Sequence, residues 1–108
     1  MTKRIVKNLE LLKALHQCNK PEQKQLLKTI RPTVVNAICD CIHNVLQGNV
    51  SISPNQKKAL QSKKNVLRQL VNKKNKSDQR KKLLIQHGSG ILNSILGPVL
   101  NTLAGLVL

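Results

Sequence analysis

The chain has 108 residues, enough for one small domain, and its 19 Lys and Arg against 4 Asp and Glu give a formal charge of +15. Such self-repulsion disfavours a compact state unless a polyanion neutralises it, and nucleic acid and anionic lipid are the expected partners. The absence of Phe, Tyr and Trp argues against modules that stack single-stranded bases on aromatic rings. Nucleic-acid binding should therefore be directed to the backbone and be largely independent of sequence.

Three helices are predicted in the N-terminal part of the chain, residues 1–47, and should form a small core. The first runs from Ile5 to Cys18, where Leu and Ile recur at helical spacing. The second, from Pro21 to Ile30, starts on a proline, which suits the first helical turn. The third, from Pro32 to Leu46, is the most apolar, and Gly48 follows it where glycine commonly ends a helix.

Residues 48–86 form a predicted Lys/Arg-rich helical segment. Ser53 and the proline after it are a typical N-cap and first helical residue, so a fourth helix is predicted from Pro54 to Val71, and a short fifth helix from Ser77 to Gln86. Lysines on a helix can serve only to solvate it, but eleven cations between Lys57 and Lys82 against one Asp favour phosphate contact through counterion release. The candidate nucleic-acid-binding residues are Lys57, Lys58, Lys63, Lys64, Arg68, Lys73, Lys74, Lys76, Arg80, Lys81 and Lys82.

No residue from Leu83 to Leu108 is charged. Residues 87–90, with two glycines, are predicted to be a flexible joint. Residues 91–108 should form an amphipathic helix with an apolar face and a small polar face, which Gly97 and Pro98 should weaken or kink.

This tail helix has three interpretations. It could lie in a membrane interface, pack as the last core helix or as a homo-oligomer contact, or span a membrane, although 18 residues are marginal for a span. The first interpretation is the preferred one. Its candidate membrane-contacting residues are Ile91, Leu92, Ile95, Leu96, Val99, Leu100, Leu103, Leu106 and Val107.

The three cysteines, Cys18, Cys39 and Cys41, do not form the framework of a disulfide-rich secreted domain and favour a reducing compartment. Cys39 and His43 would share a helix face, but Cys41 points elsewhere, and a structural zinc ion needs four ligands. Buried small thiols are therefore expected, with no metal and no cofactor. The acidic residues are scattered and no phosphate loop or nucleophile elbow occurs, so the chain is not expected to be an enzyme.

Several short patterns follow one another along the chain. After a leucine-rich helical start come the Ala/Cys-containing stretch Val35–Cys41, a Gly-Asn-Val turn at Gly48–Val50 with Pro54, and a Lys-rich helix. The run Lys81–Gln86 then leads through the glycine joint into the Leu-Gly-Pro-Val-Leu stretch Leu96–Leu100. In this order the chain resembles a small basic protein of Polinton/Maverick-type elements and adintoviruses.

The resemblance implies a virion protein alongside adenovirus-like minor or core proteins, present in the host nucleus during assembly. It also implies a viral protease as a partner, because adenovirus-type proteases cut at sites with glycine near the cut. A cut between Ser89 and Gly90 fits the looser form of that pattern, whereas Gln86 departs from the stricter form, which wants Met, Ile or Leu there.

We therefore expect an all-α protein, a small bundle of four to five short helices with an amphipathic C-terminal helix. The expected function is a structural virion protein that binds double-stranded DNA non-specifically and carries a membrane-active C-terminal helix. One alternative is a purely structural capsid or oligomerisation module, whose tail packs on protein and whose positive face meets acidic capsid proteins. The other is a cationic toxin that permeabilises membranes.

Overall fold

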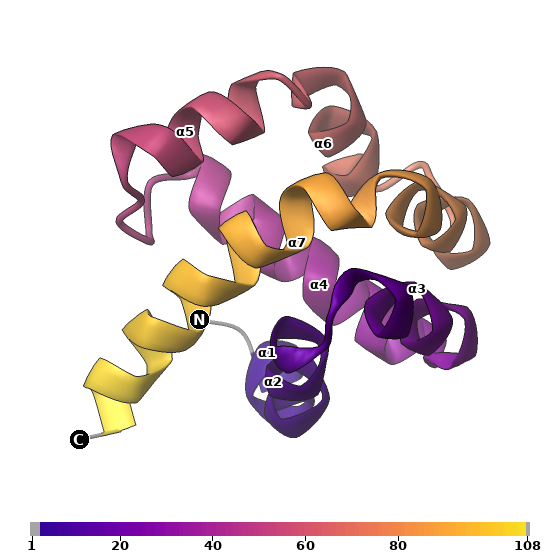
Figure 1. Ribbon diagram of the computed structural model, residues 1–108, viewed down its shortest axis with the longest axis horizontal. Helices are drawn as coiled ribbons and strands as arrows, with labels where there is room; N and C mark the ends of the chain where they lie inside the picture. The colour runs from indigo at the N-terminus through magenta and orange to yellow at the C-terminus, as the bar shows by residue number, and fades with distance from the viewer. Residues whose placement is uncertain (1–2, 108) are drawn as a thin grey trace.

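Across residues 3–107, which the computed structural model describes except for the side chains at 89–90 and 104–107, all regular elements are α-helices (Figure 1). This confirms the expected all-α class. In chain order the helices are α1 (Lys3–Lys7), α2 (Leu9–Gln17), α3 (Lys20–Thr29), α4 (Pro32–Leu46), α5 (Pro54–Gln61), α6 (Lys64–Val71) and α7 (Ser77–Val107).

The first predicted helix is divided into α1 and α2 at Asn8. The backbone N–H of Asn8 is shared between the carbonyls of Arg4 (3.3 Å) and Ile5 (3.2 Å), and its side-chain amide donates to the Arg4 carbonyl at 2.8 Å. An asparagine side chain that competes for a backbone carbonyl in this way interrupts the regular ladder. The prediction of one continuous helix was therefore wrong at a single residue.

The next two helices agree closely with their predictions. The side chain of Asn19 caps α3 by accepting a hydrogen bond from the backbone N–H of Glu22 at 2.9 Å. Helix α4 has the predicted bounds, Pro32–Leu46. Gly48 lies just beyond it with a φ of +80°, the left-handed conformation that ends many helices and that glycine adopts without steric cost.

The predicted fourth helix is divided into α5 and α6. Ser53 and Gln56 form a reciprocal capping box at the start of α5, as the Ser-Pro pair suggested. At the end of α5, the hydroxyl of Ser62 donates to the carbonyl of Ala59 at 2.7 Å, and Lys63 leaves the helical region with φ −112° and ψ 23°. The chain therefore turns at Ser62–Lys63 before it resumes as α6.

The predicted fifth helix and the tail form one element, α7, because the chain stays helical through residues 87–90. The direction of the helix nevertheless changes by 102° between Ser77–Gly88 and Ile91–Leu103. A Cβ atom added at Gly88 would lie 3.1 Å from Leu92 Cδ1 and 3.2 Å from Leu27 Cδ1. Glycine thus allows α3 and α7 to approach closely, and the expected loose joint is a packed bend.

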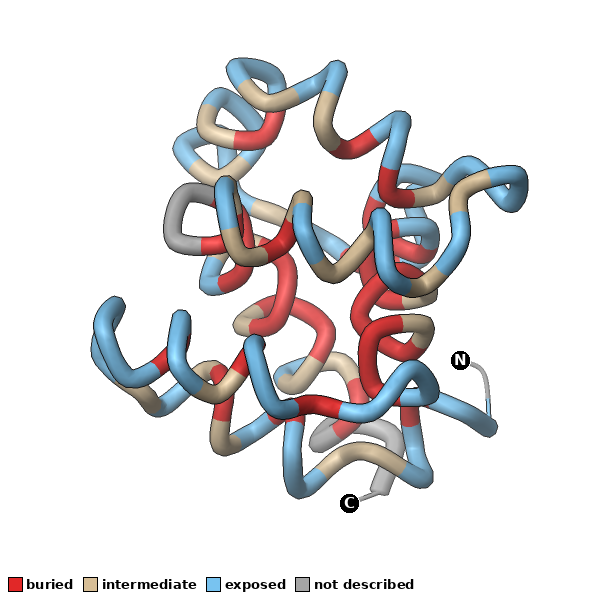
Figure 2. The backbone as a smooth tube through the Cα atoms, turned by 90° about the vertical axis from the view of Figure 1, so that its right-hand side faces the viewer, coloured by how far each residue is buried: buried red, intermediate tan, exposed pale blue. Residues whose placement is uncertain are grey.

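The second half of α7 lies at the centre of the fold. Helix α7 contacts α2, α3, α4, α5 and α6, and in Figure 1 it runs between the α1–α3 side and the α5–α6 side. Its apolar face joins the stripe of α4, which buries Val34, Val35, Ile38 and Ile42, and Figure 2 shows the buried residues on the inward turns. The tail is therefore a core helix that shares its core with residues 1–47, and the expected separate tethered tail was wrong.

Candidate polyanion-binding surface

Helices α5 and α6, with the turn between them, hold the first group of candidate cations. Lys57 and Lys58 on α5, and Lys64 and Arg68 on α6, are exposed, while Lys63 at the turn between the helices is half-buried. The inner sides of both helices are anchored by apolar side chains that are almost fully buried: Leu60, Leu67 and Leu70. The core contacts thus fix the helices that present the cations.

The loop between α6 and α7 presents a second group of exposed cations. It is not a free segment, because the backbone N–H of Lys74 donates to Asn72 Oδ1 at 3.0 Å and the side chain of Asn75 donates to the Gln69 carbonyl at 2.7 Å. These bonds order the backbone that carries its lysines before any ligand binds. The exposed lysines of the loop are Lys73, Lys74 and Lys76.

Two of the eleven candidates have structural roles instead. Arg80 donates from Nη1 to Asn36 Oδ1 at 3.1 Å and from Nη2 to the Asn72 carbonyl at 3.0 Å, so it joins α4, the α6–α7 loop and α7. Lys81 donates from Nζ to the carbonyl of Ile30, the C-cap of α3, at 3.2 Å, where a cation also interacts well with the helix dipole. Both side chains are half-buried, so they are less accessible to phosphate than Lys82, which is exposed.

In the Lys/Arg-rich segment, the eleven cations between Lys57 and Lys82 far outnumber the one acidic residue, Asp78. Among the described residues, ion pairs join Arg4 to Asp40 (2.7 Å) and Lys13 to Glu10 (3.7 Å), and neither pair uses a cation between Lys57 and Lys82. The positive charge of this surface is therefore available to an external anion.

A further row of cations, on α3, was not predicted as a binding surface from the sequence. Lys20, Lys24 and Lys28 are exposed and lie four residues apart on one side of α3. They adjoin the first half of α7, because Lys20 and Lys24 line a shallow cavity together with Ile85 and Gln86. The signal was present in the sequence as lysines at helical spacing, but their number is small beside the eleven that follow.

The candidate membrane-contacting residues are mostly core residues. None of the side chains of Ile91, Leu92, Ile95, Leu96 and Val99 is exposed to solvent, and Leu103 is only 6% exposed. Leu100 is half-buried, and the side chains of Leu106 and Val107 lie outside the described part. In this folded state the apolar face of the tail contacts protein, so the expectation of a lipid-facing surface is not met.

The described residues were also compared with the requirements for a membrane-spanning helix. Within the described part of the chain, no single helix has the length and apolar character to cross a membrane, and only the bent pair Ser77–Gly88 and Ile91–Leu103 meets both criteria together.

The proposed protease site lies at the bend of α7. The backbone at Ser89 and Gly90 is helical and the preceding Gly88 is buried, while the side chains at 89 and 90 lie outside the described part. A protease needs an accessible backbone, so cleavage after Ser89 would require local unfolding first.

The cysteines of α4 are buried thiols, as expected. Burial raises the pKa of Cys39 to about 11 and that of Cys41 to about 12. Both thiols are thus protonated and poor nucleophiles at neutral pH. Among the residues with described side chains, no three His, Cys, Asp or Glu groups are arranged to hold a metal ion.

Comparison with protein-family models, with curated proteins and with solved structures finds no match to this chain. The likeness to Polinton and adintovirus proteins is therefore a resemblance of sequence pattern alone, and its functional content remains a prediction.

Proposed function

We propose that this protein is a structural DNA-binding protein that holds the phosphate backbone of double-stranded DNA without reading its sequence. The observation that carries this proposal is the unneutralised surface of exposed cations on α5, α6 and the α6–α7 loop, which ordered backbone presents to solvent. Following the resemblance, its place would be a virion, with assembly in the host nucleus.

The mechanism is counterion release. Each lysine or arginine that neutralises a phosphate frees condensed cations, so the logarithm of the binding constant falls by about 0.9 per phosphate contact for each unit of log salt. Because the chain has no Phe, Tyr or Trp, it lacks the rings that most often stack on bases, and affinity should differ little between duplexes of different sequence.

The tail has a structural role in this proposal. Its apolar side chains hold α4 and the DNA-binding helices in one core, and burying each large aliphatic side chain contributes about 1.5–3 kcal/mol. A bilayer could accept these side chains only if the second half of α7 left the core, at the loss of that contribution.

The test is a salt titration of duplex binding followed by fluorescence anisotropy of a labelled DNA. We expect binding to weaken steeply between about 50 and about 200 mM salt. Replacement of the three loop lysines, Lys73, Lys74 and Lys76, by Gln should make the logarithmic slope shallower by about 2–3. Equal affinity at all salt concentrations, or strong preference for one duplex sequence, would contradict the proposal.

A matched control distinguishes DNA binding at this surface from DNA binding that depends only on the net charge of the protein. The triple replacement of Lys3, Lys7 and Lys13 by Gln removes the same charge from α1 and α2, outside the proposed surface. It should leave the slope nearly unchanged. If both triple variants lower the slope equally, binding depends on net charge alone and the surface is misassigned.

A further inference from the structure

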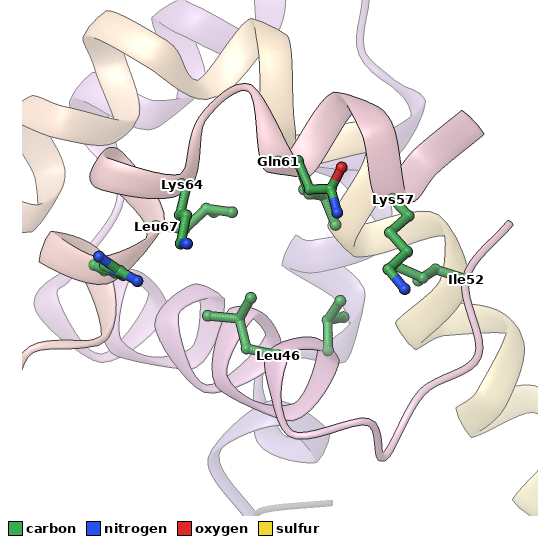
Figure 3. A pocket seen from close by; sticks show the side chains of 9 residues that line it. Leu46, Ile52, Lys57, Gln61, Lys64 and Leu67 are labelled. Carbon is green, nitrogen blue, oxygen red and sulfur yellow. The ribbon is translucent and has the colours of Figure 1, made fainter. Parts of the chain in front are cut away.

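A groove lies between the C-terminal end of α4 and the pair α5–α6 (Figure 3). Its volume is about 350 Å³, which is within the range of sites that accept small ligands or a partner's side chains. Its apolar lining comes from α4, from the loop before α5, and from α5 and α6. The apolar lining residues are Val45, Leu46, Ile52, Leu60 and Leu67.

Leu46 distinguishes this groove from the rest of the surface. The other large apolar side chains of α4 are buried, whereas Leu46 is 48% exposed. A single exposed leucine is ordinary, but this one stands opposite Lys64 and Leu67 across the groove (Figure 3). Its exposed part therefore belongs to a concave apolar surface.

The rim of the groove is cationic. Lys57, Lys64 and Arg68 line it together with Gln61, all from α5 and α6. Figure 3 shows the side chain of Lys64 on the side of the groove opposite Leu46, and the side chain of Lys57 ending beside Ile52. Positive groups and an amide thus stand along one side of an apolar floor.

This combination selects the chemistry of the occupant. A DNA phosphate can pair with the rim but has no apolar group for the floor, and a purely apolar segment would leave the cations unused. Carboxylates beside an apolar anchor satisfy both, and the charge of +15 attracts acidic partners over long range. We propose that the groove binds an acidic amphipathic peptide segment of a partner protein, with an apolar side chain on Leu46 and carboxylates on the three cations.

Peptide binding in this groove is a different proposal from DNA binding, but both would use Lys57, Lys64 and Arg68. Peptide and DNA should therefore compete, and a bound acidic segment would release DNA from this part of the surface. The competition follows from the shared cations and needs no conformational change.

The test measures binding of three labelled helical peptides to the full chain by fluorescence anisotropy. The first carries leucines on one face and glutamates on the other, the second replaces its leucines by serine, and the third replaces its glutamates by glutamine. We expect the first to bind at least about tenfold more tightly than either of the others. Equal binding of the first and second peptides would show simple charge attraction and overturn the proposal.

A matched pair of variants locates the site. Leu46→Gln should weaken binding of the first peptide about tenfold and leave the salt slope of DNA binding unchanged. Leu11→Gln, at a leucine that is 42% exposed on α2, should change neither. Far-UV circular dichroism verifies that both variants are folded.

Two further outcomes would count against the proposal. If Leu46→Gln has no effect on the peptide, the groove is not its site. If anionic vesicles bind in a manner that depends on Leu46 while the peptide does not bind, the occupant is a lipid and not a protein. Failure of DNA binding alone would leave the peptide result unaffected.

Discussion

The two halves of α7 belong to one helix but face different surroundings. The first half, Ser77–Gly88, exposes Asp78, Lys82 and Gln86. The second half, Ile91–Leu103, buries its apolar side chains completely or nearly so, except for the half-buried Leu100. The 102° bend at the glycines makes this possible, because it directs the second half between α4 and the outer helices. Loss of charge along a chain therefore marks the entry into the protein core as readily as contact with a membrane.

The largest effect on stability should come from truncating a buried side chain in the second half of α7. Leu96→Ala removes a fully buried side chain and should lower the free energy of unfolding by about 2–5 kcal/mol. Urea unfolding followed by far-UV circular dichroism measures it, since the chain has no aromatic residue for fluorescence.

The control lies on the same helix. Asn101 is exposed, and Asn101→Ala should change the stability by no more than about 0.5 kcal/mol. If Leu96→Ala were as mild as this control, the second half would not be part of the core and the contrast within α7 would be lost.

The bend itself should tolerate one added carbon atom but not three. Gly88→Val directs branched methyl groups at Leu27 and Leu92, which already lie 3.2 and 3.1 Å from a Cβ at this position, and should cost about 1–3 kcal/mol by overpacking. Gly88→Ala should stay within about 0.5 kcal/mol of the wild type, because the gain in helix propensity offsets the shift of two flexible leucine ends. Equal stability of both variants in urea unfolding would mean that α3 does not pack against the bend.

Two neighbouring lysines of the first half should separate structure from binding. Lys81→Gln removes the bond to the Ile30 carbonyl and should cost about 1 kcal/mol of stability with little change in the salt slope of DNA binding. Lys82→Gln, at an exposed position, should leave stability unchanged and make the slope shallower by about 0.9. The reverse pattern, from urea unfolding and DNA titration of both variants, would contradict the assignment of Lys81 as a helix-capping residue.

The sequence predicted the helices best where several signals coincide. Helix α4 has a proline at its start, a glycine after its end and a broad apolar stripe, and its bounds were predicted correctly. The breaks at Asn8 and Ser62 depend on single side chains that bond to nearby carbonyls, which residue types at that spacing do not reveal. Such local competition decides boundaries more often than it decides helix existence.

For the candidate sites, the sequence pattern does not show which side chains remain on the surface. A count of cations shows the charge of a segment, but Arg80 and Lys81 are withdrawn by acceptors 44 and 51 residues away. Likewise, apolar residues 91–103 satisfy the same pattern in a bilayer or in a core, and only contacts with α4 distinguish the two. Tertiary partners, and not composition, decided which cations and which apolar side chains remain on the surface.

The smallest expected effect on stability tests whether water reaches the buried face of α4, the helix that the second half of α7 covers. The pKa of Cys41 is raised from 9.0 to about 12, chiefly by burial. The folded chain therefore keeps the thiol proton where the unfolded chain loses it, so stability is fully present below pH 9 and falls as the pH rises from there toward the folded pKa. At about pH 9.5 the loss of stability should be somewhat below 1 kcal/mol relative to neutral pH.

Cys41→Ala should remove this part of the dependence of stability on alkaline pH. The titration of the lysines affects both proteins alike and cancels in the difference. Identical alkaline slopes in urea unfolding would mean that water reaches the thiol and that the helix covering α4 leaves it accessible.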